Sequence, residues 1–71
     1  MKTAIFAGTF DPPTYGHLNI IERAKNTFDE LHVVVALNQG KKCLFSPDER
    51  LNMLQQLTGQ WDNVKVRFGI N

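Results

Sequence analysis

The sequence has only one cysteine, Cys43, and it has no long apolar run. A single thiol cannot form a disulfide within the chain, which is typical of a protein from a reducing compartment. No stretch approaches the roughly 20 apolar residues that a membrane helix needs. Met1-Lys2 leads into an apolar segment too short for the core of a signal peptide. We therefore expect a cytoplasmic protein without a membrane partner.

The chain also has almost no net charge, +1 at pH 7 over 71 residues. A balanced chain has no electrostatic reason to bind nucleic acid, so we expect no nucleic-acid partner. Neither a Gly-x-Gly-x-x-Gly pattern nor a P-loop lysine signature occurs, which argues against dinucleotide dehydrogenases and P-loop NTPases. Without repeats or linkers, residues 1–71 should form one small domain or part of one.

What the chain does contain is an alternation of apolar and amphipathic segments. Unbroken apolar runs, typical of strands covered by helices on both faces, predict strands over Lys2 to Ala7, Leu31 to Leu37 and Val64 to Phe68. Apolar residues at three- and four-residue spacing predict helices from Thr14 or Tyr15 to about Phe28 and from Ser46-Pro47 to Thr58. The order β-α-β-α-β predicts an α/β fold: a Rossmann-like parallel sheet with right-handed crossovers, half of a doubly wound sheet.

Capping residues set the limits of the two predicted helices. Thr14 and Ser46 are suitable N-caps, and Glu49 would complete a capping box with Ser46. Gly59 is expected to end the second helix in the left-handed conformation. The expected apolar faces consist of Leu18, Ile21, Ala24 and Phe28 in the first helix and Leu51, Leu54 and Leu57 in the second.

Two polar loops, Gly8 to Pro13 and Asn38 to Cys43, follow the first two strands. Ligands of such sheets bind beyond the carboxyl ends of the strands, so we expect the loops to share a site. Thr9 offers a hydroxyl, and His17 lies in the first turn of a helix, whose free amides and dipole attract phosphate. The same residues are also compatible with a tight turn and a capped helix, with His17 at the surface.

The second loop carries Lys41-Lys42. This pair could simply be solvated, or it could reach anionic groups held by the first loop. Asp11 could bind a metal, although an Asp before Pro more often fixes a turn. We assign no chemistry to Cys43, and we expect His32 and Trp61 to be structural.

The first loop resembles a known family signature. Gly8-Thr9-Phe10-Asp11-Pro12 followed by Thr14-Tyr15-Gly16-His17 is similar to the His-x-Gly-His motif of the nucleotidylyltransferase superfamily, in the form with Thr at the first position. With Lys41-Lys42 and Phe45-Ser46-Pro47-Asp48-Glu49-Arg50, the chain resembles bacterial phosphopantetheine adenylyltransferases from its first strand to its third. The resemblance implies the N-terminal part of a nucleotidylyltransferase (cytidylyltransferase-like) domain that is truncated after the third strand.

The resemblance also implies an activity: adenylyl transfer from ATP to 4′-phosphopantetheine, giving dephospho-coenzyme A and pyrophosphate in coenzyme A biosynthesis. His17 would bind the ATP phosphates and stabilise the transition state. Thr9 would bind the phosphate of phosphopantetheine, the Thr9-Phe10 backbone would contact ATP, and Lys41 would bind the attacking phosphate. Magnesium would be held mainly by substrate phosphates rather than by metal-ligating residues of the protein. The full-length family forms homohexamers.

Two alternatives stay open. The chain could be a non-catalytic fragment that binds nucleotide or phosphate, because the later half of the family's chain supplies further ATP-binding residues. It could also belong with nicotinate-mononucleotide adenylyltransferases or glycerol-3-phosphate cytidylyltransferases. Those branches usually have His where Thr14 stands, so Thr14 and the segment 45–50 favour the phosphopantetheine branch.

Overall fold

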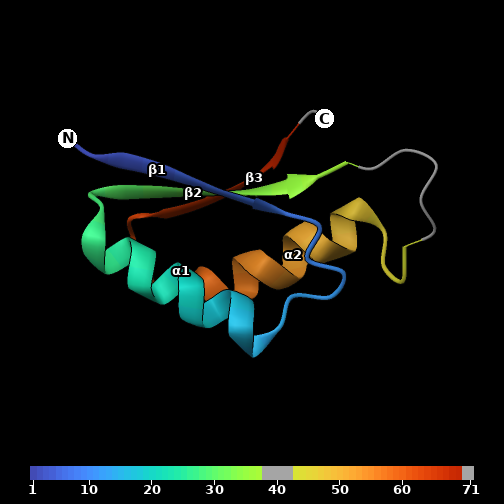
Figure 1. The fold of residues 1–71 in the computed structure, drawn as a ribbon. Coiled ribbons are helices and arrows are strands. Elements are labelled where there is room, and N and C mark those ends of the chain that lie inside the picture. The colour runs from blue at the N-terminus through green and yellow to red at the C-terminus, as the bar shows by residue number, and fades with distance from the viewer. Residues whose placement is uncertain (38–42, 70–71) are drawn as a thin grey trace.

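The computed structural model describes residues 1–37 and 43–69. The elements are two helices and three strands: β1 (Thr3–Gly8), α1 (Tyr15–Thr27), β2 (Glu30–Ala36), α2 (Pro47–Thr58) and β3 (Val64–Gly69) (Figure 1). All five predicted elements are therefore present, and the ends of each lie within one residue of the predicted ends.

The strands form one parallel sheet in the order β1-β2-β3. Gly8 at the end of β1 lies opposite Val35 of β2, and Ala36 lies opposite Gly69 of β3. The carboxyl ends of all three strands therefore meet at one edge of the sheet. This confirms the predicted α/β parallel fold and brings the loop after β1 to the edge where β2 ends.

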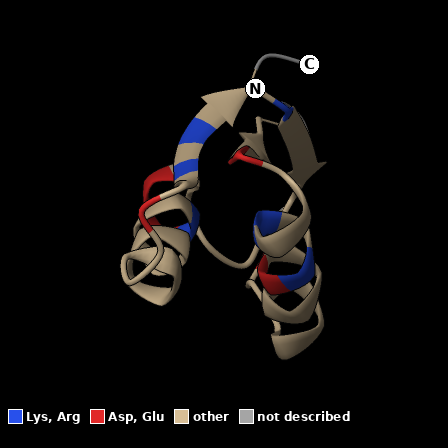
Figure 2. Cartoon of the chain, turned by 90° about the vertical axis from the view of Figure 1, so that its left-hand side faces the viewer, with Lys and Arg blue, Asp and Glu red and all other residues tan. Residues whose placement is uncertain are grey.

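Both helices lie on the same face of the sheet (Figures 1 and 2). Successive right-handed crossovers that move in one direction along a sheet place their helices on one side. The expectation that helices cover both faces is therefore wrong for this chain. On the opposite face Ile5 is 65% exposed, and β1 alternates exposed with half-buried residues.

The core lies between the sheet and the two helices. Every second residue of β2 points into it, and Ile21 of α1 and Leu54 of α2 contact these strand residues from below. Trp61 packs against the same cluster, as expected from the sequence. The buried members of the core are Phe10, Ile21, Leu31, Val33, Val35, Leu54 and Val64.

The buried face of α2 differs from the predicted leucine stripe. Arg50, Leu54 and Thr58 are buried at four-residue spacing, whereas Leu57 is 38% exposed. A four-residue step keeps side chains on one face as well as a three-residue step does, and Thr58 satisfies its hydroxyl by donating to the carbonyl of Leu54. Gly59 follows with φ of −61°, so the predicted left-handed cap is also wrong.

Candidate active site

The loop between β1 and α1 turns inward at Phe10. Phe10 has a positive φ of 52°, which is uncommon outside glycine, and its ring is 2% exposed. The ring packs edge-on against Phe6 with centroids 5.4 Å apart. A Cβ atom at Gly8 would lie 3.1 Å from this ring, so glycine allows the close approach there. Burial of the Phe10 ring fixes the loop backbone at the end of β1.

Thr14 and His17 form two reciprocal hydrogen bonds at the start of α1. The backbone N–H of Thr14 donates to Nδ1 of His17 at 2.9 Å, and the N–H of His17 donates to the Thr14 hydroxyl oxygen at 3.4 Å. This is a capping box in which histidine takes the position usual for Glu or Gln. The predicted N-cap is thus confirmed.

The capping box assigns the tautomer of His17. An amide N–H can donate only to a ring nitrogen that carries no proton, so Nδ1 is the acceptor and Nε2 carries the proton of the neutral ring. No protein partner of Nε2 occurs among the described residues. The His17 side chain can therefore donate one hydrogen bond from Nε2 to a ligand.

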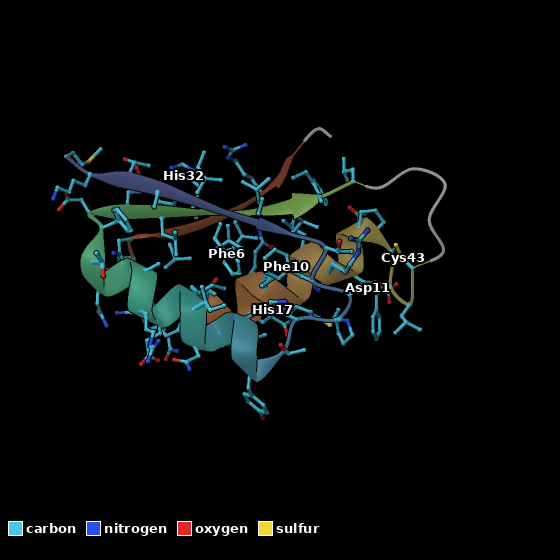
Figure 3. All side chains as sticks on the ribbon, viewed as in Figure 1. Phe6, Phe10, Asp11, His17, His32 and Cys43 are labelled. Carbon is cyan, nitrogen blue, oxygen red and sulfur yellow. The ribbon has the colours of Figure 1, made fainter. Side chains whose placement is uncertain are left out.

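His17 also packs against the loop after β1. Its ring meets that of Phe10 edge-on, with centroids 4.8 Å apart (Figure 3). The half-buried Thr9 directly precedes Phe10 at the carboxyl end of β1. The structure thus brings Phe10 and His17 into contact, and Thr9 is the neighbour of Phe10 in the chain. Lys41 lies outside the described residues.

Asp11 connects this loop to the segment that leads into α2. Its two carboxylate oxygens accept the backbone N–H groups of Leu44 at 2.7 Å and Phe45 at 2.8 Å. Burial acts to raise the pKa of Asp11, but these two hydrogen bonds, the charge of Arg50 and the thiol of Cys43 together outweigh it and leave the pKa below its ordinary value. Asp11 therefore joins two distant segments instead of fixing a turn within its own loop.

Arg50, in the first turns of α2, makes a second connection. Its side chain is buried, with 1% exposed, and Nη1 donates to the carbonyl oxygens of Thr9 at 2.9 Å and Ala36 at 3.2 Å. In the sequence, Arg50 stood out only as the last residue of the motif at 45–50. A charged residue four positions after the N-cap and at the core spacing of Leu54 was the signal that could have singled it out.

The described residues contain no group of three His, Cys, Asp or Glu side chains placed to hold a metal ion. Both oxygens of Asp11 already accept backbone hydrogen bonds. Within residues 1–37 and 43–69, no helix has the length and apolar character required to cross a membrane.

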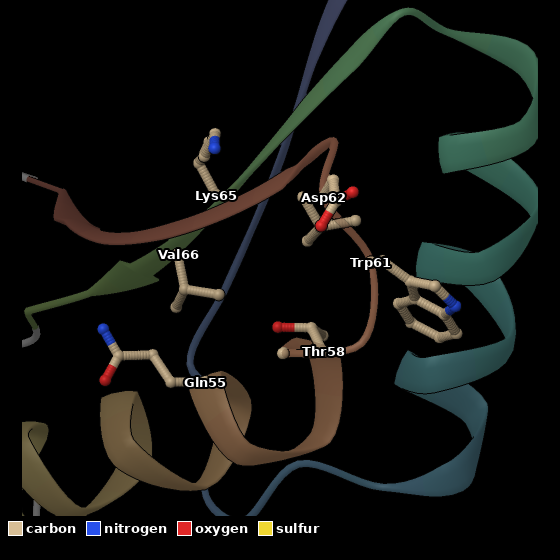
Figure 4. A pocket seen from close by; sticks show the side chains of 8 residues that line it. Gln55, Thr58, Trp61, Asp62, Lys65 and Val66 are labelled. Carbon is tan, nitrogen blue, oxygen red and sulfur yellow. The ribbon is translucent and has the colours of Figure 1, made fainter.

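Hollows lined entirely by described residues lie near the helices. One, of about 410 Å³, is formed where the start of α1 meets the exposed Leu57, and it is lined by Pro13, Thr14, Tyr15, Leu18 and Leu57. Another, of about 470 Å³, lies between α2 and β3, with Gln55 and Thr58 on one side and Val66 on the other (Figure 4). It is separate from the loop that carries Thr9.

Comparison with known proteins identifies the family to which this fold belongs. A family model described as cytidylyltransferase-like matches residues 5–68, which include the loop after β1, α1 and the whole of α2. The chain belongs to the cytidylyltransferase-like family. Its loop with Thr9 and its helix start with His17 are therefore parts of a family domain and not an isolated turn.

This cytidylyltransferase-like chain is similar to curated phosphopantetheine adenylyltransferases. It is 52% identical to one from Clostridium botulinum over 94% of this chain and 41% of the relative. It is 48% identical to one from Caldanaerobacter subterraneus subsp. tengcongensis over 96% of this chain and 42% of the relative. The chain thus spans about two fifths of the length of these relatives.

A solved structure supports the fold. NadR protein, in a crystal structure with NAD and AMP-PNP, superposes with a TM-score of 0.84 over 97% of this chain and 20% of that chain. The sequences are 24% identical, so the likeness concerns the fold alone. It agrees with the parallel sheet and the helices on one face described above.

Proposed function

We propose that the full-length product of the gene that encodes this chain transfers an adenylyl group from ATP to 4′-phosphopantetheine in coenzyme A biosynthesis. The observation that carries the proposal is the hydrogen bond from the Thr14 N–H to Nδ1 of His17, which leaves Nε2 as the ring nitrogen that can donate to a ligand. The similarity to phosphopantetheine adenylyltransferases supports the choice of substrate. In this proposal the described residues form the N-terminal part of the site, in a domain that continues beyond β3.

The reaction depends more on the positioning of the phosphates and the stabilisation of their charge than on a general base. An oxygen of the phosphopantetheine phosphate attacks the α-phosphorus of ATP and forms a new P–O bond. The bond between the α-phosphorus and the bridging oxygen breaks, and pyrophosphate leaves with that electron pair. Because the nucleophile is already an anion, no general base has to remove a proton. Donors aimed at the phosphates are the main protein contribution to such a reaction.

Each residue has a proposed task. His17 donates from Nε2 to the ATP phosphates and stabilises the charge that develops in the transition state. The backbone of Thr9 and Phe10 contacts ATP, while the Thr9 hydroxyl binds the phosphate of phosphopantetheine. Lys41 binds the attacking phosphate. The contact between Phe10 and His17 supports this arrangement, because the loop after β1 and the start of α1, which we propose to bind ATP, lie against each other there.

We further propose that magnesium reaches the site with ATP, held mainly by phosphate oxygens. The carboxylate nearest to the loop, Asp11, is engaged with two backbone amides, so this part of the chain offers no cage of its own for the ion. Bound magnesium would neutralise phosphate charge. Use of ATP and the single cysteine favour a cytoplasmic location, and we propose that the full-length protein is a homohexamer.

The test is a panel assay of the full-length gene product. ATP or CTP is supplied as nucleotide, with 4′-phosphopantetheine, nicotinate mononucleotide or glycerol 3-phosphate as acceptor, and pyrophosphate release is measured. We expect turnover only with ATP and phosphopantetheine, and dephospho-coenzyme A as product. Turnover with another pair would overturn the substrate assignment in favour of a related nucleotidylyltransferase.

Binding without turnover is the outcome that would favour a non-catalytic fragment. Calorimetry with ATP and phosphopantetheine therefore accompanies the assay, on both the 71-residue chain and the full-length gene product. Turnover by the full-length product together with binding alone by the 71-residue chain would assign the activity to the complete protein. Binding without turnover by both would contradict the proposed enzyme.

A further inference from the structure

Arg50 is the buried charged side chain of the described core, and it makes its hydrogen bonds to two parts of the site at once. One nitrogen, Nη1, donates to the carbonyl of Thr9 in the loop after β1 and to the carbonyl of Ala36 at the end of β2. The two carbonyl groups lie at the carboxyl ends of different strands, β1 and β2. The guanidinium therefore fixes the spacing between the loop that carries Thr9 and the end of β2.

Asp11 closes the connection from the other side. It accepts the amides of Leu44 and Phe45, which lie just before α2, while Arg50 on α2 reaches back to Thr9. The loop after β1 is thus attached on each side of Phe10, through Thr9 to α2 and through Asp11 to the segment that precedes α2. Phe10 has a positive φ, a backbone conformation that non-glycine residues rarely adopt and that persists only where the surrounding structure holds it. The hydrogen bonds on both sides of Phe10 hold it in this conformation.

We infer that Arg50 is a positioning residue for adenylyl transfer: it holds the Thr9 backbone in place so that the hydroxyl of Thr9 faces the phosphate of phosphopantetheine while Nε2 of His17 faces the phosphates of ATP. This inference rests on the proposed function. Arg50→Lys would keep the charge but replaces the rigid planar guanidinium, whose Nη1 serves both carbonyls, with an ammonium on a flexible stem. A methionine would keep much of the volume and remove both donors.

The test compares three variants of the full-length gene product: Arg50→Lys, Arg50→Met and, as a control, Leu54→Ala. Leu54 is fully buried on the same face of α2 but has no polar contact with the loop, so its truncation lowers stability without releasing Thr9. Unfolding is measured first, and kcat and KM are then measured at a temperature at which each variant is folded.

We expect Arg50→Met to lower kcat/KM for phosphopantetheine by about 10²-fold, because displacement of a binding group by about 1 Å has effects of that size. Arg50→Lys should recover part of the loss, and Leu54→Ala should leave kcat/KM of the folded protein unchanged. Equal kcat/KM for Arg50→Met and Leu54→Ala would overturn the inference, because Arg50 would then contribute only to stability. If Arg50→Met does not fold, Arg50→Lys is compared with Leu54→Ala by the same criterion.

A binding experiment separates this inference from the proposed function. ATP is titrated into isotope-labelled wild type, Arg50→Lys and Leu54→Ala, and the NMR signals of the Thr9 and Phe10 amides are followed. Weaker ATP binding in Arg50→Lys, but not in Leu54→Ala, supports the positioning role even if phosphopantetheine is not the acceptor. Wild-type affinity in Arg50→Lys would overturn it. A wild-type protein that neither turns over nor binds ATP would overturn both the function and the inference.

Discussion

At position 8 the chain depends on the absence of a side chain. A Cβ atom there would approach the Phe10 ring to 3.1 Å, which is tighter than ordinary packing, whereas a Cβ atom at Gly16 would meet only the Thr14 hydroxyl at 3.5 Å. The two glycines of the loop and helix start therefore have different tasks. Gly8 makes room for a buried ring, and Gly16 lies in the exposed first turn of α1.

This difference gives a paired prediction. Gly8→Ala should lower the free energy of unfolding by about 1–3 kcal/mol, because overpacking displaces Phe10. Gly16→Ala should leave stability unchanged or raise it by up to about 1 kcal/mol, because alanine is favoured over glycine within a helix. Urea denaturation of the 71-residue chain measures both. Equal destabilisation by the two substitutions would contradict the packing described for Phe10.

The residues of the site were only partly readable from the sequence. The pattern around Thr9 and His17 pointed to a candidate site because strand, loop and helix start follow one another along the chain. The links made by Asp11 and Arg50 join residues 33 and 41 positions apart, and no local pattern reports such distances. The tautomer of His17 was also hidden, because it depends on the orientation of the Thr14 amide.

At the level of elements, the bounds of both helices were predictable, whereas the backbone conformation at the end of α2 was not. Ser46 accepts the amide of Glu49 at 3.2 Å, and the Glu49 carboxylate accepts the amide of Ser46 at 3.0 Å, as the sequence indicated. A capping box is a local arrangement of four consecutive residues, so it can be recognised in the sequence. Gly59 was misjudged because a helix can also end without a left-handed residue.

Ser46→Ala should lower the free energy of unfolding by about 1 kcal/mol, the usual effect of removing an N-cap side chain. The substitution leaves the free amides of α2 with water as their partner. The measurement is chemical denaturation at neutral pH, with the exposed Asn52→Ala as a control in the same helix. A larger effect from Asn52→Ala than from Ser46→Ala would show that the cap does not stabilise α2.

The link between the loop and α2 should depend on pH. The pKa of Asp11 is lowered in the folded chain, since the effect of burial is outweighed by the amides of Leu44 and Phe45 together with the charge of Arg50 and the Cys43 thiol. A carboxyl with a lowered pKa stabilises the fold above its ordinary value, about pH 4. This contribution is lost as the pH falls through the lower folded value.

Asp11→Asn should therefore be less stable than wild type at pH 7, and the difference should shrink as the pH falls below about 4. Urea denaturation from pH 7 to pH 2.5 measures it. Glu49, whose pKa the Ser46 amide and hydroxyl lower, follows the same direction, so Asp11→Asn should retain some acid sensitivity. A stability difference that stays constant down to the lowest pH would contradict a charged Asp11 acting across the two segments.

At the level of the whole molecule, the order of elements predicted the sheet correctly and the coverage of its faces wrongly. Apolar runs in β1 and β2 suggested burial on both sides, yet both helices lie on one face and Ile5 is 65% exposed. An apolar strand sequence indicates that the faces of the strand can be buried, but it does not indicate which segment of the protein buries them. The chain spans about two fifths of its curated relatives.

The one-sided arrangement predicts unequal effects of two core-type substitutions. In the 71-residue chain, Ile5→Thr should change the free energy of unfolding by less than about 1 kcal/mol, because the side chain is largely in water. Leu54→Ala should lower it by about 2–5 kcal/mol, since Leu54 is fully buried between α2 and the sheet. Similar losses would mean that the outer face is covered in solution.

The proposed mechanism depends most on the N–H group at Nε2 of His17, which donates to the ATP phosphates. His17→Asn tests it most directly, because the Asn side-chain oxygen can still accept the Thr14 amide while the distal donor is removed. In the full-length gene product we expect unchanged unfolding and a loss of about 10²- to 10³-fold in kcat/KM for adenylyl transfer, the effect of removing one transition-state donor. A His17→Asn protein that turns over at the wild-type rate would contradict the account.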